Sequence, residues 1–318
     1  MRLSGLRPIA LVLTREVMIT VLLLLGVSFV VFVILYLAPG DPFSMLVEGQ
    51  VQSEEARAGA REALGFSQSW YSQYFSWVTQ MLQGDFGTSI RTGLPVASEL
   101  VFVGFNTLIL TIGSMLVTLL IAVPIALYSS VRGTTALSWP LTMFAYVVSA
   151  LPVFWLGYIV IYIFMHRFGL FPLMTSSSRG FSWLYALLPI VVLGVGNGTI
   201  SEVIRSLRDE MGRVMSEDYI RTARAKGASV WKHSFKEGFL IPVTEIIAAK
   251  IPFILGGAVI VEQVFNWPGM GRMAWQAAQD RDYPVIMAIA IAAALLVRIG
   301  TLVQRVVYVT VNPRASQE

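Results

Sequence analysis

VSFVVFVIL (residues 27–35) lies inside an interval, from Glu16 to Asp41, that has no charged residue between its ends. An α-helix rises by about 1.5 Å per residue, so about 20 apolar residues cross the hydrocarbon layer of a membrane. A cleavable signal peptide is the alternative, because arginines precede the interval, but its apolar region is shorter, at about 7–15 residues. The residues that follow, LAPGD (37–41), also make a poor cleavage site. We therefore predict an uncleaved first membrane span.

The composition predicts that most of the chain lies in a membrane. Hydrophobic residues make up 56% of the 318 residues and charged residues 13%, whereas typical globular proteins have about 45–50% and about 25%. So few charges cannot cover a water-facing surface of ordinary size, which excludes two soluble domains. Disorder and collagen-like repeats are excluded too, because the chain is apolar and its glycines follow no period. The fold class that we predict is an all-α polytopic membrane protein.

The residues that most enzymes use for catalysis are scarce in this sequence. It contains no cysteine, and His166 and His233 are its two histidines, which excludes disulfides, cysteine-ligated zinc, thiol nucleophiles and histidine clusters. Neither a phosphate-binding G-x-x-x-x-G-K-[ST] loop nor a G-x-S-x-G nucleophile elbow occurs. We expect no catalytic residue, no metal site and no cofactor, and we predict that the chain is not an enzyme.

Apolar segments predict six membrane helices in all, near residues 17–38, 102–129, 138–165, 183–203, 241–265 and 284–309. An even number places both termini on one side. The segments on that side carry twice as many Lys and Arg residues as the loops on the other side, and the side richer in these residues is the cytoplasm. We therefore interpret the net charge of +4 as an orientation signal and predict no nucleic-acid partner.

This topology predicts a single transmembrane domain over residues 1–318. Its parts are an N-terminal segment with the first span, an external loop, spans two to four, a cytoplasmic loop, and spans five and six with the C-terminal tail: 1–38, 39–101, 102–203, 204–239 and 240–318. The two loops are the polar parts of the chain, and the external one is too long for a mere connection.

The external loop is acidic and aromatic. Its sequence Ser53-Glu54-Glu55 is typical of a helix start, with Ser53 as the N-cap. Aromatic residues then recur at spacings that place them on one side of a helix: Trp70, Tyr71, Tyr74, Phe75 and Trp77. We predict a helix that packs on the protein or lies at the lipid headgroup boundary, and stacking of these rings on a substrate is the alternative.

The cytoplasmic loop carries closely spaced charges of both signs from Arg205 to Lys226. A solvated amphipathic helix is one explanation. A short polar helix between two membrane spans is not stable alone, however. We therefore favour a helix that is stabilised by docking on a cytoplasmic protein.

Several motifs, in order along nearly the whole chain, resemble those of one transporter family. The strongest is DYIRTARAKG (218–227), which is similar to the "EAA" coupling loop of permease subunits in bacterial ATP-binding-cassette (ABC) importers, in the version of the peptide/nickel class. The others are LAPGDPF (37–43), GDFGTS (84–89), EQVFNWPGMG (262–271), RDYP (281–284) and NPR (312–314). The long external loop with GDFG resembles that of the "B" member of the B/C permease pair.

Three features depart from the family pattern. The run from Gly227 to Pro242 is shorter than in this class, which leaves the register of the coupling helix open. Near the C-terminus, Arg305 stands where the family carries an Asp, and Asn312-Pro313 replaces its Asp-Pro. Charged residues also lie inside the predicted fifth span, where the family has neutral polar ones.

The resemblance implies a type I importer permease in the bacterial cytoplasmic membrane, in contact with lipid. Its implied partners are a second, homologous permease subunit, two cytoplasmic ABC ATPase subunits and an extracytoplasmic substrate-binding protein. Relatives of this class carry di- and oligopeptides, nickel chelates, opines, glutathione or oligosaccharides, and we favour peptides. A self-contained secondary transporter or channel is the alternative function, but the sequence shows no inverted repeat. A membrane scaffold is a third.

The resemblance also implies site residues. ATPase coupling is assigned to Arg221, Thr222, Ala223, Arg224, Ala225, Lys226 and Gly227, and contact with the binding protein to Gly84, Asp85, Phe86, Gly87 and Thr88. From the residues alone, Gly227 is typical of a helix end in the left-handed conformation. PGMG (268–271) is typical of a tight turn at the outer surface, where glycine supplies torsions that other residues resist.

Charges inside the predicted spans are the candidates for the translocation pathway: Lys250, Glu245 and Arg298. A charge in lipid costs about 2.5–3.5 kcal/mol on insertion scales, so such residues usually face the protein interior or water. Glu245 lies five positions before Lys250, a poor spacing for an ion pair on one helix face. We predict that Lys250 lines the pathway as a weak site for a substrate carboxylate, with snorkelling to the headgroups as the alternative. For Arg298 the alternative is a structural pair within the bundle.

Overall fold

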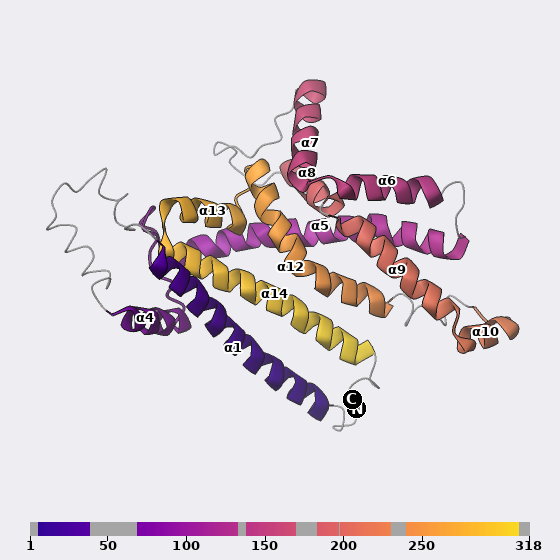
Figure 1. Ribbon diagram of the computed structural model, residues 1–318, viewed down its shortest axis with the longest axis horizontal. Coiled ribbons are helices and arrows are strands. Elements are labelled where there is room, and N and C mark those ends of the chain that lie inside the picture. Colours follow the sequence, from indigo (N-terminus) through magenta and orange to yellow (C-terminus); the bar gives the residue numbers. More distant parts are fainter. Residues whose placement is uncertain are drawn as a thin grey trace. The chain divides into compact units, whose positions relative to one another are not determined.

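The computed structural model describes residues 6–38, 69–132, 138–169, 183–196, 198–229 and 240–311, which are almost entirely helical (Figure 1). Its helices are α1 (Leu6–Leu37), α4 (Trp70–Leu82), α5 (Val96–Arg132), α6 (Ser138–Ala150), α7 (Val153–Phe168), α8 (Trp183–Val195), α9 (Thr199–Met215), α10 (Asp218–Ala225), α12 (Ile241–Val264), α13 (Met270–Asp280) and α14 (Tyr283–Val311). The described residues form no strand beyond an isolated antiparallel bridge between Thr88 and Pro95. The predicted all-α class is confirmed.

In the described part of the chain, three stretches of helix are long and apolar enough to cross a membrane: Thr14–Leu37, Val96–Ser130 and Tyr283–Val303. They coincide with the predicted first, second and sixth spans. Two bent helix pairs raise the number within the described residues to five if each pair forms one span. The count of six and the cytoplasmic termini stay predictions.

The predicted third span, residues 138–165, is wrong as a single helix. The chain forms α6 and α7 instead, and their axes differ by 102°. Pro152 stands at the break, with φ −57° and ψ 133°. Proline donates no backbone hydrogen bond and disfavours a helical conformation in the residue before it, so the helix ends there and restarts.

The predicted fourth span, residues 183–203, is likewise interrupted. It is divided between α8 and α9, whose axes differ by 50°. Gly198, at the start of α9, has φ 73°, a left-handed conformation that glycine adopts without a steric penalty. Helix α9 continues to Met215, well beyond the end that hydropathy predicted.

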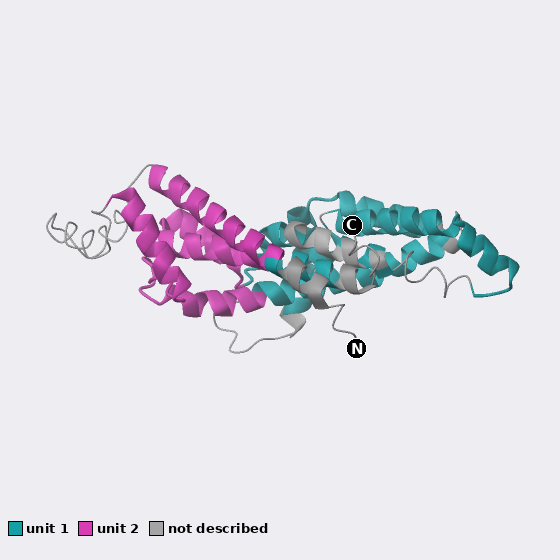
Figure 2. Cartoon of the chain, turned by 90° about the horizontal axis from the view of Figure 1, so that it is seen from below, with its two compact units in different colours: residues 1–14, 107–267, 297–318 teal, residues 15–106, 268–296 magenta. Residues whose placement is uncertain are grey.

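The chain forms two compact units (Figure 2): Met1–Thr14, Thr107–Trp267 and Val297–Glu318 in the first, Arg15–Asn106 and Pro268–Leu296 in the second. In the first unit, α12 packs against α7, α8 and α9, and α6 packs against α9. The apolar face of α9 is completely buried there, through Ile200, Val203, Ile204, Leu207, Met211 and Val214. Their spacing is that of one face of an α-helix. The first part of the predicted cytoplasmic loop is therefore stabilised by its own unit.

The second unit has its own core, formed mainly by α13 and the beginning of α14. Val96, Met270, Ala277, Val285, Ala288 and Ile289 are buried in it, and Phe86 and Leu100 pack against it. Helix α4 packs on α1 in the same unit. Tyr74 places its ring 5.4 Å from that of Phe29 and 5.3 Å from that of Phe32, and its hydroxyl lies 3.0 Å from Ser28 Oγ.

Helix α4 has one ring packed on α1 and three exposed rings; their place at the headgroup boundary stays a prediction, with stacking on a substrate as its alternative. The helix itself is confirmed, and Tyr74 holds it on α1. Trp70, Tyr71 and Phe75 are exposed, as expected of rings at a headgroup boundary. The helix start that was predicted at Ser53 lies outside the described residues.

Candidate functional site

Helix α10 forms the centre of the predicted coupling segment. Two bonds close its C-terminal end: the Gly227 N–H donates to the Arg224 carbonyl at 3.1 Å, and the Ala228 N–H donates to the Ala223 carbonyl at 2.9 Å. Gly227 has φ 68°. This pair of bonds around a left-handed glycine is the Schellman motif, which satisfies carbonyls at a helix end. The prediction that Gly227 ends the helix in this conformation is confirmed.

Helix α10 divides its residues between a buried and an exposed side. Ile220 and Ala223 are buried, whereas the remaining coupling residues are exposed: Arg221, Thr222, Arg224, Ala225, Lys226 and Gly227. Arg221 and Asp218 form an exposed ion pair on the same helix, with the Arg221 guanidinium 3.4 Å from the Asp218 carboxylate. Within the described chain, neither Arg224 nor Lys226 forms an ion pair. Beside Arg221, which pairs with Asp218, the helix thus presents two cations that have no ion pair among the described residues, Arg224 and Lys226.

The external motif GDFGTS forms the first half of a tight hairpin. Gly84 and Gly87 both have positive φ, 82° and 78°, and the Asp85 carboxylate accepts a hydrogen bond from the Gly87 N–H at 2.8 Å. Across the hairpin, the Val96 N–H donates to the Gly87 carbonyl at 3.0 Å. Asp85 and Thr88 are exposed, whereas Phe86 packs against the core of the second unit. Of the five predicted contact residues, this geometry leaves Asp85 and Thr88 as the side chains most accessible to a partner.

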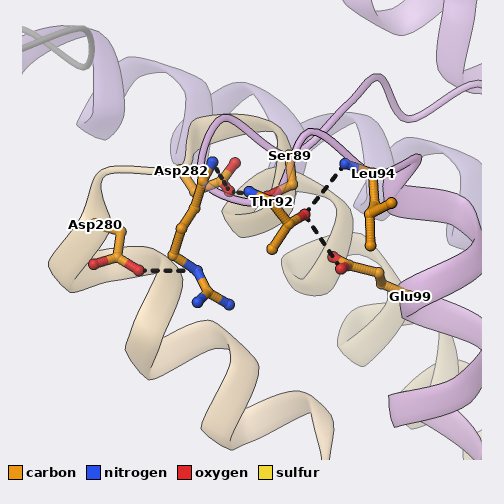
Figure 3. Close-up of polar contacts among 7 residues, drawn as sticks. Ser89, Thr92, Leu94, Glu99, Asp280 and Asp282 are labelled. Carbon is orange, nitrogen blue, oxygen red and sulfur yellow. Dashed lines mark hydrogen bonds and ion pairs between the residues drawn. The ribbon is translucent and has the colours of Figure 1, made fainter. Parts of the chain in front are cut away.

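A buried carboxylate holds this hairpin on the corner between α13 and α14 (Figure 3). Asp282 is 2% exposed, and its Oδ2 accepts hydrogen bonds from Ser89 Oγ at 2.5 Å and from the Arg91 N–H at 3.2 Å. The Arg91 side chain pairs with Asp280, with Nε and Oδ2 3.1 Å apart. The motifs GDFGTS and RDYP therefore form one structure. The sequence showed both motifs but not their contact, because no local pattern relates residues that are 193 positions apart.

A second buried carboxylate lies near the end of α12. Glu262 is fully buried and accepts a hydrogen bond from Thr107 Oγ1 at 2.7 Å, while its backbone carbonyl accepts one from the Trp267 N–H at 2.8 Å. These contacts place the start of EQVFNWPGMG in the core of the first unit. The motif was predicted only as a turn, so its glutamate was missed as a structural residue.

The turn itself differs from the prediction. Asn266 has the positive φ, 54°. Gly269 is extended, with φ −112° and ψ 177°, and stands at the N-cap position of α13, whose first residue is Met270. The prediction that the glycines of PGMG supply unusual torsions is wrong, because the chain reverses before them and asparagine tolerates the left-handed region.

The three charges proposed for the pathway lie in α12 and α14. Glu245 and Lys250 are in α12, but their side chains lie outside the described part. Arg298 is half-buried on α14. Whether these residues line a pathway stays a prediction.

Comparison with known proteins matches two family models to this arrangement. Residues 120–317 match the binding-protein-dependent transport system inner membrane component, and residues 9–95 match the N-terminal domain of such membrane components. The chain belongs to this family. It is the pore-forming permease subunit of an importer of the ABC type, located in the inner membrane, and its several apolar helices agree with a multi-pass protein.

Curated relatives of this permease cover almost its full length. It is 37% identical to the oligopeptide transport system permease protein AppB of Bacillus subtilis (strain 168), over 94% of this chain and 97% of the relative. It is 35% identical to the glutathione transport system permease protein GsiC of Escherichia coli (strain K12), over 90% and 92%. The probable peptide ABC transporter permease protein y4tP of Sinorhizobium fredii is 32% identical over 94% and 97%. The resemblance inferred from the motifs is confirmed.

Proposed function

We propose that the permease carries di- or oligopeptides, delivered by an external binding protein, and that separate ATPases drive it by docking on α10. The single observation that carries the coupling part is the exposed cationic side of α10, closed by the Schellman motif at Gly227. Arg224 and Lys226 are free to meet carboxylates or backbone carbonyls of an ATPase subunit. The buried residues Ile220 and Ala223 connect this surface to its own unit. Closure of the ATPases then rocks the membrane helices as rigid bodies.

The peptide part of the proposal rests on the relatives. The name of AppB assigns oligopeptides to that protein, the name of GsiC assigns glutathione, and y4tP is named a probable peptide transporter subunit. Glutathione is itself a small peptide. A peptide offers a carboxylate to a cation in the pathway, which is the role predicted for Lys250. Identification of the ligand that copurifies with the cognate binding protein tests this part. A sugar or a metal chelate in that position contradicts it.

The coupling part is tested with two glycines that have the same conformation. Gly227 and Gly169, the C-cap of α7, have φ 68° and 61°, and a Cβ at either meets no atom within 4 Å. Substitution of either by valine therefore imposes a similar backbone penalty, about 1–2 kcal/mol. We expect Gly227→Val to abolish ATP-driven peptide uptake in reconstituted vesicles and to reduce recovery of the ATPases with the permease. Gly169→Val is the matched control and retains both.

Normal uptake and normal ATPase recovery in Gly227→Val contradict docking on α10. An equal loss in Gly169→Val also contradicts it, because the defect then follows from backbone strain in general and not from the place of α10.

For the external hairpin, we propose that Asp85 and Thr88 contact the binding protein. Both are exposed, and the bonds of Asp282 to Ser89 and to the Arg91 N–H hold the hairpin in place. Photocrosslinkers at these two positions are expected to capture the binding protein. Crosslinks that stay within the permease in every nucleotide state contradict this contact and favour a lid that packs only on its own chain.

A further inference from the structure

A half-open cavity of about 410 Å³ lies among α5, α6 and α9 in the first unit. Its polar lining consists of Ser129 and Ser130 from α5, Tyr146 from α6, and Arg205, Arg208 and Asp209 from α9. None of these residues belongs to the coupling segment, the external hairpin or the predicted pathway. Two arginines against one aspartate leave the lining with a net positive charge.

Three groups of this lining have no partner among the described residues, although the Ser130 hydroxyl donates to the Ala126 carbonyl at 2.8 Å. Ser129 is 3% exposed, and its hydroxyl has no hydrogen-bond partner within the described residues. Neither Arg205 nor Arg208 forms an ion pair there. A buried hydroxyl without a partner is costly, by about 1–3 kcal/mol. A ligand that accepts hydrogen bonds from a hydroxyl and carries negative charge would satisfy both groups together.

The arginines point to phosphate chemistry. Arg205 and Arg208 are three positions apart on α9, so both lie on the same side of this helix. The planar guanidinium group binds phosphate oxygens in bidentate fashion. Basic pockets between membrane helices are general binding sites for the headgroups of anionic lipids.

The neighbouring surface of α6 favours a lipid as the source of this phosphate. Trp139 and Met143 precede Tyr146 by seven and three positions, so they share one helical stripe with this cavity residue. Both are large and exposed. An exposed apolar stripe beside a basic cavity offers acyl chains a surface next to the headgroup, which a soluble phosphate compound does not need.

We propose that this cavity binds the phosphate headgroup of an anionic membrane phospholipid, with its acyl chains along α6. Ser129 donates a hydrogen bond to a phosphate oxygen, and Arg205 and Arg208 neutralise its charge. Phosphatidylglycerol has a matching phosphodiester. The site lies at the part of α9 that leads to α10, so occupation stabilises the base of the coupling segment.

Binding of lipid to the purified permease with its copurifying subunits, measured by native mass spectrometry, tests the proposal. Short-chain phosphatidylglycerol is compared with phosphatidylcholine of the same chain length and with inorganic phosphate. The variant is the double substitution Arg205→Gln and Arg208→Gln. Arg213→Gln is the matched control, because Arg213 lies on the same helix, is exposed, pairs with Glu210 and does not line the cavity.

We expect phosphatidylglycerol to bind at least tenfold more tightly than phosphatidylcholine. The double variant should weaken this binding by tenfold or more, since each arginine near a lipid headgroup contributes about fivefold in affinity. The control should change it by less than about twofold.

Four outcomes overturn the proposal. The first is equal binding of the two lipids, and the second is a loss of binding in Arg213→Gln as large as that in the double variant. The third is displacement of the lipid by an equal concentration of inorganic phosphate. The fourth is loss of a protein subunit from the double variant with lipid binding unchanged. The third assigns the site to a soluble phosphate compound, and the fourth assigns the arginines to a protein partner.

A second variant keeps the test decisive if the double variant does not fold. Ser129→Ala removes a hydroxyl that has no partner, so its folding is expected to be normal. It should weaken phosphatidylglycerol binding by about tenfold, which is the lower limit of the effect of one hydrogen bond to a charged group. Unchanged affinity in a folded Ser129→Ala protein contradicts the proposed site.

Discussion

The external hairpin and helix α10 are both short, polar and closed by glycines with positive φ. They differ in their charges, which are hydrogen-bonded or ion-paired at the hairpin and exposed on α10, two of them without an ion pair among the described residues. At the hairpin, the Oδ2 atom of the buried Asp282 accepts hydrogen bonds from Ser89 Oγ and the Arg91 N–H, and the Arg91 side chain pairs with Asp280. On α10, Arg224 and Lys226 are exposed. Removal of one partner of a buried, hydrogen-bonded charge is strongly destabilising, because the other partner is left without compensation. Exposed charges contribute little to stability and remain available for another molecule.

The most severe test of this contrast is Asp282→Ala. The substitution leaves the buried Ser89 hydroxyl and the Arg91 N–H without their acceptor, so we expect the free energy of unfolding to fall by about 2–3 kcal/mol. The thermal unfolding midpoint of the purified permease measures the effect. The control is Asp280→Ala, which removes the more exposed pair with Arg91 and should cost about 0–1 kcal/mol. Equal losses in the two variants would remove the distinction between buried and exposed carboxylates.

A smaller effect is expected in the first unit, where Glu262 is also buried. Thr107→Val keeps the shape of the side chain but removes the hydroxyl that donates to Glu262. We expect a loss of about 1–2 kcal/mol, because the carboxylate keeps its burial with one donor fewer. Thr111→Val is a matched control on the same helix. The Thr111 hydroxyl is buried with no partner in the described residues, so this variant should be neutral or slightly stabilising. A loss at Thr111 as large as that at Thr107 would contradict the role of the hydrogen bond.

The smallest effect on stability is expected on α10. Substitution of both Arg224 and Lys226 by glutamine should change the free energy of unfolding by less than about 0.5 kcal/mol, because exposed residues without ion pairs contribute little. Recovery of the ATPases with the permease should nevertheless fall, since these cations are proposed to meet the partner. A melting midpoint lowered as far as in Asp282→Ala, with ATPase recovery unchanged, would show that the charges are structural and would erase the contrast.

Local features of the sequence predicted what depends on neighbours along the chain. The apolar runs of α1, α5 and α14 identified the membrane class, because hydropathy over about 20 residues is a property of one helix. Gly227 was predicted correctly because a left-handed helix end needs only the residues of the last turn. The motifs identified the family because each is a short run of neighbouring residues, and the family models and the relatives confirmed it.

Predictions from the sequence failed in two cases: where a helix is interrupted, and where packing on distant helices determines which face of a helix is buried. Pro152 breaks the third predicted span, and hydropathy averaged over a window did not register one residue of this kind. The buried face of α9 shows the second case. Its apolar spacing is present in the sequence, but the charges between those positions drew the prediction toward a solvated or docked helix.

By itself, the sequence determined that this protein is a helical membrane permease and where the chain of α10 turns back. Tertiary structure alone decided that Asp282 meets Ser89, that Glu262 meets Thr107, and that Ser129 shares a cavity with Arg205. The physical reason is that hydropathy and helix capping are short-range properties, whereas the pairing of a buried polar group depends on which distant helix the fold brings beside it.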